Sequence, residues 1–170
     1  MITYKSFETD RLILKPTDNE DANFLIELMN TPKWLQYIGD RNVKTIDDAL
    51  KYIALKVTPQ FQQLGFGNYT VIRKFDGTKI GSCGLYKRDG IDGIDIGFAF
   101  LPKFEKMGYA YESAQKLLKV ALPIFNIETI FAITIKENTD SQKLIEKLGL
   151  RFQKIIRIPN DEEDLMLYKL

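Results

Sequence analysis

Apolar residues recur along this chain at two spacings, and each spacing predicts a kind of element. In segment 91–101 they occupy alternate positions from Ile94 to Phe100, as in a strand with one buried face. In segment 109–122 they recur every three or four residues, as along one side of a helix. β-Branched residues dominate 129–135. The middle of the chain is therefore predicted to be strand, helix, strand.

The first part of the chain predicts a strand followed by a helix. Segment 11–16 has the apolar content of a strand, and 17–30 places its apolar residues on one helical face. Thr17 and Glu20 have the spacing of a capping box, in which two side chains satisfy free main-chain amides at a helix start. Turn-forming and aromatic residues then predict a loop over 31–42.

Proline and glycine mark the boundaries of the elements predicted between residues 45 and 87. A second helix is predicted to begin near Thr45 and to end or kink at Pro59, because proline lacks the amide that a helix interior uses. Segments 67–74 and 79–87 flank Asp76–Gly77, a dipeptide typical of hairpin turns. We therefore expect these two segments to pair as antiparallel strands.

The last part predicts a short helix and a second hairpin. Segment 137–150 has helical spacing and is closed by Gly149, a residue favoured just past a helix C-terminus. Segments 151–158 and 163–170 are predicted strands around a polar turn. Together the elements predict an α/β fold in which helices cover both faces of a mixed sheet.

Composition narrows the classes of function. Of 170 residues, 45% are hydrophobic and 28% are charged, so we expect one globular domain over residues 1–170. The 24 basic and 23 acidic residues nearly balance, which argues against nucleic-acid or membrane partners. The chain lacks an apolar run of membrane-spanning length, and its first residues lack that of a signal peptide. A cytoplasmic location is expected.

The chain contains no histidine, and Cys83 is its single cysteine. This excludes Ser-His-Asp and Cys-His catalysis and His-ligated zinc, and we expect no metal site. Cys83 has no clear basic neighbour to stabilise a thiolate, so it fits a small buried strand residue better than a nucleophile. Chemistry must use carboxylates, hydroxyls, lysines, main-chain dipoles or a bound cofactor.

Segment 102–108 connects the predicted strand to helix 109–122. Gly108 permits main-chain conformations that a side chain would block, and Ala110 keeps the first helical turn small. The first amides of a helix lack intrahelical partners and attract anions, and Lys106 adds positive charge nearby. The segment is either a tight connection or a cradle for phosphate, and these residues alone leave both possibilities open.

Asn138 and Ser141 stand at the start of the helix that follows strand 129–135. Residues of these types commonly cap helices, and that is the simpler interpretation. They can also meet a ligand, because ligands of α/β proteins lie beyond the carboxyl ends of the strands. Two such helix starts after two neighbouring strands favour a ligand more than either start alone.

These stretches resemble the cofactor-binding core of the GNAT acetyltransferases. The resemblance is carried by IDIGFAFLPKFEKMGYAYESAQKLLKVAL and FAITIKENTDSQKLIEKLGLRF, while the opening ETDRLILKPTDNED is similar to the branch of ribosomal-protein N-terminal acetyltransferases. The family's pyrophosphate loop has Gln or Arg, two residues, Gly, one residue, then Gly or Ala. Here it corresponds to 105–110, with Glu105 as a departure. We expect the Glu105 carboxylate to face away from the pyrophosphate.

The resemblance implies acetyl-coenzyme A (acetyl-CoA) as acetyl donor. It also implies a splay between the fourth and fifth strands, 91–101 and 129–135, where the pantetheine arm would pair with main-chain groups. The residues implied to hold the cofactor are Phe98, Phe100, Leu101, Lys106, Met107, Gly108, Tyr109, Ala110, Asn138 and Ser141.

In this family a free amine usually attacks the thioester directly, which requires positioning, an oxyanion donor and proton transfer. Asp95 matches an acidic residue of related enzymes and is expected to accept the proton, directly or through water; a solvated strand face is the alternative. A main-chain amide near Phe98 is the candidate oxyanion donor. Asn138 is placed near the reacting end of the cofactor. Ser141 or water is expected to protonate the thiolate, because the helix offers no tyrosine.

The sequence thus predicts an N-acetyltransferase that moves an acetyl group from acetyl-CoA to a primary amine, either a protein N-terminus or a small amine. Trp34 and Tyr37 are expected to line the acceptor pocket, although packing over the sheet is an alternative. Tyr37 and Asp92 are weaker candidates for the base. The competing function is a non-catalytic acyl-CoA sensor or interaction module. Monomer and homodimer are both compatible with the sequence.

Overall fold

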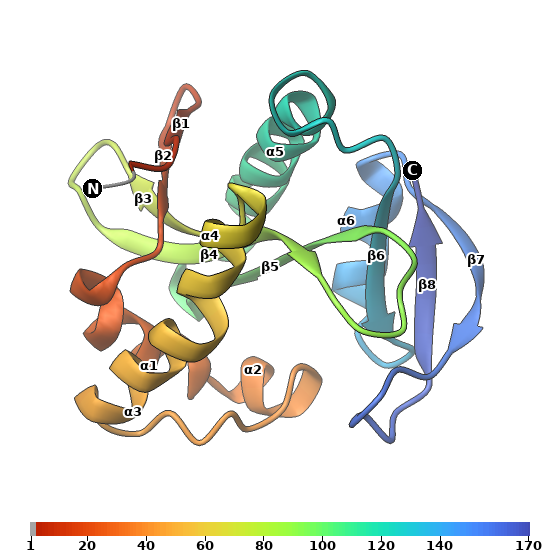
Figure 1. The fold of residues 1–170 in the computed structure, drawn as a ribbon, viewed down its shortest axis with the longest axis horizontal. Helices are drawn as coiled ribbons and strands as arrows, with labels where there is room; N and C mark the ends of the chain where they lie inside the picture. Colours follow the sequence, from red (N-terminus) through yellow and green to blue (C-terminus); the bar gives the residue numbers. More distant parts are fainter. Residues whose placement is uncertain (1–2) are drawn as a thin grey trace.

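The computed structural model describes residues 3–170, which form an eight-stranded sheet with helices on both faces (Figure 1). The strands lie in the order β1-β2-β3-β4-β5-β6-β8-β7, and every neighbouring pair is antiparallel except β5 and β6. The predicted mixed α/β sheet is therefore confirmed. Its strands are β1 (Phe7–Glu8), β2 (Leu12–Pro16), β3 (Asn68–Arg73), β4 (Lys79–Lys87), β5 (Ile94–Phe100), β6 (Ile130–Ile135), β7 (Arg151–Ile156) and β8 (Leu165–Lys169).

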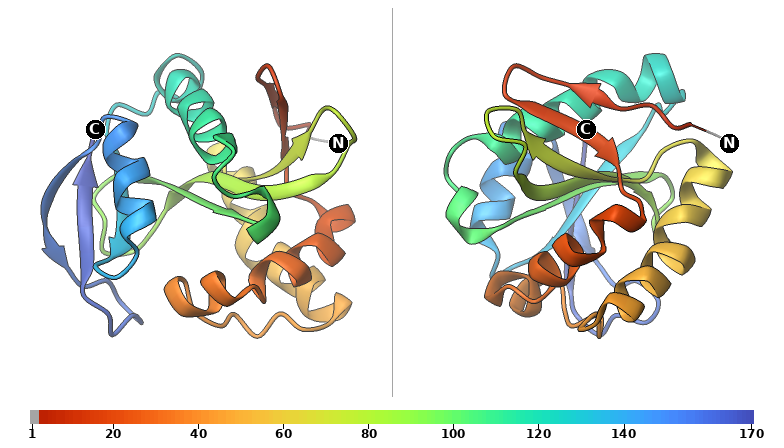
Figure 2. Two further views of the ribbon diagram at one scale, coloured as in Figure 1. Left: turned by 180° about the vertical axis from the view of Figure 1, so that it is seen from behind. Right: turned by 90° about the vertical axis from the view of Figure 1, so that its left-hand side faces the viewer.

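The helices form two groups. Figure 2 shows α5 across one face of the central strands and α1 to α4 on the other, while α6 lies against β6. No helix of residues 3–170 has the length and apolar character needed to cross a membrane. The α-helices are α1 (Ala22–Met29), α2 (Pro32–Tyr37), α3 (Ile46–Tyr52), α4 (Thr58–Leu64), α5 (Tyr109–Phe125) and α6 (Thr139–Lys147), and shorter segments are 3₁₀ turns at Asn19–Asp21 and Pro102–Phe104 and a π-helical turn at Ile53–Val57.

Strands β5 and β6 separate soon after they meet. Their parallel pairing includes only Ile94 with Ile130 and Asp95 with Phe131, although β5 continues to Phe100. Beyond Asp95 the main chain of β5 on this side has no strand partner. The splay predicted between these two strands is confirmed.

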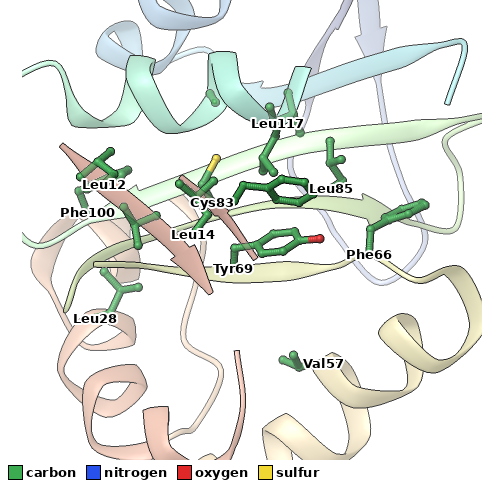
Figure 3. Close-up of a cluster of buried hydrophobic side chains, with 14 of the residues drawn as sticks. Leu12, Leu14, Leu28, Val57, Phe66, Tyr69, Cys83, Leu85, Phe100 and Leu117 are labelled. Atoms are coloured by element: carbon green, nitrogen blue, oxygen red, sulfur yellow. The ribbon is translucent and has the colours of Figure 1, made fainter. Parts of the chain in front are cut away.

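The core lies on both sides of the central strands. In Figure 3 the Cys83 side chain points to the α5 side, where Leu117 lies, while Leu28 and Val57 lie on the opposite side. Cys83 is completely buried, and burial raises the pKa of its thiol to about 12. Its predicted role as a small core residue is confirmed, because a thiol this weakly acidic is not a nucleophile at neutral pH.

The capping box of the first helical segment lies one residue later than predicted. Asp18 accepts a hydrogen bond from the amide of Glu20, and Asp21 accepts one from the amide of Asp18. Thr17 is unavailable, because its amide bonds to strand β3 and its hydroxyl lies 2.9 Å from that of Thr70. The prediction that Thr17 and Glu20 form the box is therefore wrong, although the helix is present.

One further prediction about the N-terminal helices is wrong, and another is right only in part. Segment 31–42 is not all loop, because Thr31 caps helix α2 through the amide of Trp34 and Pro32 occupies its first turn. The second helix begins at Thr45 as predicted, but helical structure continues past Pro59 to Leu64. A π-helical turn directly precedes α4, and its wider ring accommodates the missing proline amide.

The completely buried carboxylate of Asp21 supports this helical region. It lies 2.6 Å from Lys79 Nζ and 3.2 Å from Lys15 Nζ. Burial alone would raise the pKa of Asp21, but the hydrogen bond from Lys79 and the other partners lower it below 3.8. We expect Asp21→Asn to reduce the free energy of unfolding by about 2 kcal/mol.

The pH dependence of this effect follows from the lowered pKa. A carboxylate with a lowered folded-state pKa stabilises the protein above its unfolded pKa, and that stabilisation disappears as the pH falls through the folded value. Urea unfolding should therefore show a constant deficit for Asp21→Asn between neutral pH and about pH 5, shrinking below pH 3.8. Asp164→Asn, an exposed partner of Arg157, is the control. An equal deficit in both variants would contradict the prediction.

Candidate functional site

The loop before α5 presents a run of free amides. Lys106 and Gly108 have positive φ angles of 60° and 82°, and α5 has no side-chain cap at Gly108. Within the described part of the chain, the amides of residues 106–111 have no hydrogen-bond acceptor. Free amides at the start of a 17-residue helix form an anion site, because the helix dipole adds to their partial charges. This arrangement suits a pyrophosphate.

Arg11 connects this loop to the first turn of α5, a role that the sequence did not predict. Its Nη1 donates to the carbonyl of Met107 at 3.0 Å, and its Nε donates to Glu112 in the first turn of α5 at 2.7 Å. The guanidinium also lies 4.4 Å from the centre of the Tyr109 ring. Arg11 belongs to the ETDRL stretch that carried part of the resemblance, but its partners are about a hundred residues away along the chain.

Glu105, the departure from the family loop, is paired with a lysine. Its carboxylate lies 2.7 Å from Nζ of Lys33 on α2, and the same Nζ lies 3.7 Å from Asp140 at the start of α6. Lys33 therefore joins the segments that follow β5 and β6. The ammonium group of Lys33 compensates the negative charge of Glu105 at a position where the family has Gln or Arg. The hydrogen bond to Glu105 raises the pKa of Lys33.

The amides of β5 alternate between its two neighbours. The Leu101 amide donates to the carbonyl of Ile80 in β4, and the pairing of β4 with β5 is regular. In an antiparallel ladder, the amides of Phe98 and Phe100 must then face the splay. The Leu101 amide is used by Ile80 and its carbonyl already accepts from Phe104, so its main chain is less available to a pantetheine arm than that of Phe98 or Phe100. The contact expected for Leu101 stays a prediction.

A cavity of about 550 Å³ opens between the splayed strands and the N-terminal helices. It brings together most of the side chains predicted for the reacting end, although they come from four separate elements or loops. It does not include residues 105–110, which lie at the other end of β5. Among its lining residues are Trp34, Tyr37, Asp95, Phe98, Asn138 and Ser141.

Asn138 caps a helix, and both Asn138 and Ser141 lie at the cavity. The Asn138 side chain accepts a hydrogen bond from the Ser141 amide at 3.3 Å and so caps α6. Both residues also line the cavity. Capping uses the Asn138 Oδ1 atom, and the amide nitrogen of that side chain has no acceptor among residues 3–170. The cap thereby fixes Asn138 at the edge of the cavity.

Asp95 is buried, with only 1% of its surface exposed, so the alternative of a solvated strand face is wrong. Its side of β5 faces into the protein, where Tyr86 of the neighbouring strand and Arg88 lie beside it. Nε of Arg88, at 2.8 and 3.0 Å, contacts both carboxylate oxygens. Burial raises the pKa of the Asp95 carboxyl, and the charge of Arg88 opposes that rise. A carboxylate in this environment can accept a proton more readily than an exposed one.

Sequence reasoning missed Arg88 and a polar network beside it. Arg88 lies over the ring of Tyr86 at 5.0 Å. The Tyr86 hydroxyl donates to Oδ1 of Asn68, which also accepts from Ser82. All four residues line the cavity. Because Tyr86 pairs across the sheet with Asp95, knowledge of the strand register would have placed Arg88 beside the candidate base.

Comparisons with known proteins agree with this architecture. The family model described as "Acetyltransferase (GNAT) domain" matches residues 11–151. The uncharacterized N-acetyltransferase YnaD of Bacillus subtilis (strain 168) is 26% identical over 166 residues, which cover 95% of this chain and 94% of the relative. A crystal structure of a GNAT-family acetyltransferase from Bacillus anthracis is 25% identical, with a TM-score of 0.79 and 98% of each chain covered.

A third similar protein was solved with coenzyme A. It is RimL, a ribosomal L7/L12 alpha-N-protein acetyltransferase, with a TM-score of 0.82, 16% identity, and coverage of 98% of this chain and 97% of its own. At that identity the likeness concerns the fold alone. The family match spans most of the chain, so the chain belongs to the GNAT acetyltransferase family and is an N-acetyltransferase.

The pairing of Lys33 with Glu105 leads to a testable effect on cofactor affinity. Lys33→Met should weaken acetyl-CoA binding about fivefold, because the Glu105 carboxylate then repels the pyrophosphate without compensation. In a Glu105→Gln background, calorimetry should find that the same change has little effect. Lys44→Met removes an exposed lysine of the same region and is the control. Equal losses in both backgrounds would show that Glu105 is not involved.

Proposed function

We propose that the protein transfers the acetyl group of acetyl-CoA to a primary amine by direct attack in a ternary complex. The observation that carries this proposal is the coincidence of two features along β5. Free amides lie at one end, in residues 106–111, and a cavity containing Asp95 lies towards the other, joined by an unpaired strand edge. Their order matches that of a pyrophosphate, a pantetheine arm and a reacting thioester.

The residues present fit acetyl-CoA. The amides around Lys106, Met107, Gly108, Tyr109 and Ala110 would hold the pyrophosphate, and the main chain of Phe98 and Phe100 would hold the pantetheine arm. Asn138 and Ser141 would lie beside the reacting end. When bound, acetyl-CoA supplies an acetyl group activated as a thioester.

The chain contributes positioning and proton transfer. The amine nitrogen forms a bond to the acetyl carbon while the carbon–sulfur bond breaks, and the nitrogen gives up a proton to Asp95, directly or through water. The amide of Phe98 would donate to the carbonyl oxygen as it gains charge. Ser141 or water would return a proton to the sulfur. Trp34 and Tyr37 would contact the acceptor from α2.

Release of free thiol on mixing acetyl-CoA with a panel of amines and peptides tests this proposal. The expected result is thiol release that depends on both substrates, with the acetylated amine identified by mass spectrometry. Tight acetyl-CoA binding without turnover over a broad panel, and unaffected by Asp95→Ala, would instead support an acyl-CoA sensor. Hydrolysis without an amine product would contradict direct transfer.

A further inference from the structure

The lining of the cavity carries more positive than negative charge. Arg41, Lys56, Lys87 and Arg88 line it, against the carboxylates of Asp95 and Asp161. Asp95 is already paired with Arg88. No carboxylate of residues 3–170 lies within ion-pair distance of the other three cations. A chain with nearly balanced charge has therefore gathered unpaired positive charge around the cavity that contains Asp95.

Arg88 is fixed in place by its neighbours, but part of its guanidinium group remains free to donate hydrogen bonds to a ligand. Its Nε is used by Asp95, and its plane lies over the Tyr86 ring. Neither Nη atom has an acceptor within the described residues, and 36% of the side chain is exposed. An arginine fixed by one nitrogen and stacked on an aromatic ring can offer its remaining donors to a carboxylate with little loss of side-chain entropy.

Tyr52 of α3 brings a hydroxyl to the same place. Tyr52 is among the residues that line the cavity, and its hydroxyl has no hydrogen-bond partner among residues 3–170. Burial raises the pKa of Tyr52, and the positive charges of Arg41 and Arg88 oppose this rise, which puts both guanidinium groups within electrostatic range of the hydroxyl. Arg41 in the loop before α3, Tyr52 at the end of α3 and Arg88 just after β4 thus bring donors and positive charge to one region.

We propose that the acceptor amine carries a carboxylate group, which Arg88, Arg41 and the Tyr52 hydroxyl bind. The acceptor class is therefore an amino acid or a peptide whose first residue is acidic, and the two share this chemistry. This inference rests on the proposed acetyl transfer and adds the feature by which the acceptor is selected.

The same positive charge also assists the reaction. An ammonium group near cations loses its proton more easily, because like charges disfavour its charged form. A carboxylate bound by the arginines anchors the acceptor while its amine, nearer Asp95, is driven towards the neutral nucleophile. An acceptor with no negative group would instead be repelled from the cavity as a cation.

The test compares acceptors that differ only in this group. Amino acids are assayed against their amides, and tetrapeptides that start with glutamate against those that start with glutamine, by initial rates at saturating acetyl-CoA. The carboxylate-bearing member of a pair should have at least a tenfold higher kcat/KM. Preference within the first pair identifies a free amino acid as the source of the carboxylate, and preference within the second a peptide.

Variants connect the preference to the proposed residues. Arg41→Gln and Tyr52→Phe should each lower the preference about fivefold, chiefly through a higher KM for the carboxylate-bearing acceptor. Arg151→Gln, which removes a positive charge from the exposed strand β7, should leave the preference intact. All three variants leave the Arg88–Asp95 pair in place.

Two kinds of result distinguish a failure of the carboxylate proposal from a failure of the proposed acetyl transfer. Transfer to amides and acids at equal rates, or a preference that survives in Arg41→Gln and Tyr52→Phe, overturns the carboxylate proposal while acetyl transfer stands. Absence of transfer to every amine, with acetyl-CoA bound normally, overturns the proposed function and this inference with it.

Discussion

Gly108→Glu is expected to weaken acetyl-CoA binding at least a hundredfold. Gly108 has a φ of 82°, and a Cβ built there would lie 3.2 Å from Nη2 of Arg11. The substitution strains the main chain by about 1–2 kcal/mol and disturbs the residue that holds the loop. It also places a carboxylate among the free amides, where repulsion by a pyrophosphate amounts to several kcal/mol at protein-like dielectric.

Gly65→Glu provides a closely matched control for this prediction. Gly65 has a φ of 80°, nearly the same as that of Gly108, and a Cβ there would meet nothing within 4 Å. Both variants carry the same conformational cost and the same new charge, but Gly65 follows α4, outside the loop. Calorimetry should find normal acetyl-CoA affinity in Gly65→Glu. Normal affinity in a folded Gly108→Glu would refute the pyrophosphate site.

Affinity in Gly108→Ala should fall between those of the wild type and Gly108→Glu. The methyl group introduces the strain of a left-handed conformation without a charge, so a loss of about tenfold is expected. The difference between the alanine and glutamate variants then measures electrostatic repulsion. That difference should decrease in high salt, because the site is open to solvent.

The parts of the fold that were predictable depend on local chemistry. Periodicity located strands β2 to β8 and helix α5 but missed the two-residue strand β1, and Asp76–Gly77 located the first hairpin, because residues within a few positions determine these features. The α2 helix was missed although Thr31 and Pro32 are a recognised helix start. The aromatic residues after them suggested an exposed loop, and only the cavity they line explains their presence.

The candidate site was predictable where a motif specifies main-chain geometry. Gly108 and the splay of β5 from β6 follow from such motifs. The charged partners were not predictable in this way. Lys33 and Glu105 are 72 residues apart, and Arg11 and Glu112 are 101 apart, so tertiary structure alone brings them together.

The same limitation explains the misjudged environment of Asp95. Alternation along β5 correctly placed Asp95 on the opposite face of the strand from Ile94 and Ile96. Alternation cannot tell, however, whether that second face is exposed to solvent or buried. Here that face is turned into the protein, and Arg88 provides the countercharge that makes burial tolerable. A buried charged pair beside a cavity is more informative about function than an exposed carboxylate.

Asp95→Asn is expected to lower kcat about a hundredfold and to change acetyl-CoA affinity less than twofold. Asparagine has the shape of aspartate and still accepts a hydrogen bond from Arg88 Nε, so the orientation of Arg88 should persist. What is lost is the capacity to accept a proton. Because burial raises the pKa of Asp95, the wild-type rate should rise with pH through that raised pKa, and this limb should be missing in the variant.

Acceptors of different basicity distinguish a base from a merely structural residue. With an amine of low pKa, which is already neutral at the assay pH, the deficit of Asp95→Asn should narrow, because less proton removal is required. Asp92→Asn changes an exposed carboxylate just before the same strand and should react at the wild-type rate. An undiminished rate of Asp95→Asn at saturating amine would remove Asp95 from the mechanism. If the loss of kcat in Asp95→Asn were the same for amines of every basicity, Asp95 would be assigned the role of positioning Arg88. Only a residue that accepts the proton should be sensitive to how tightly the amine holds it.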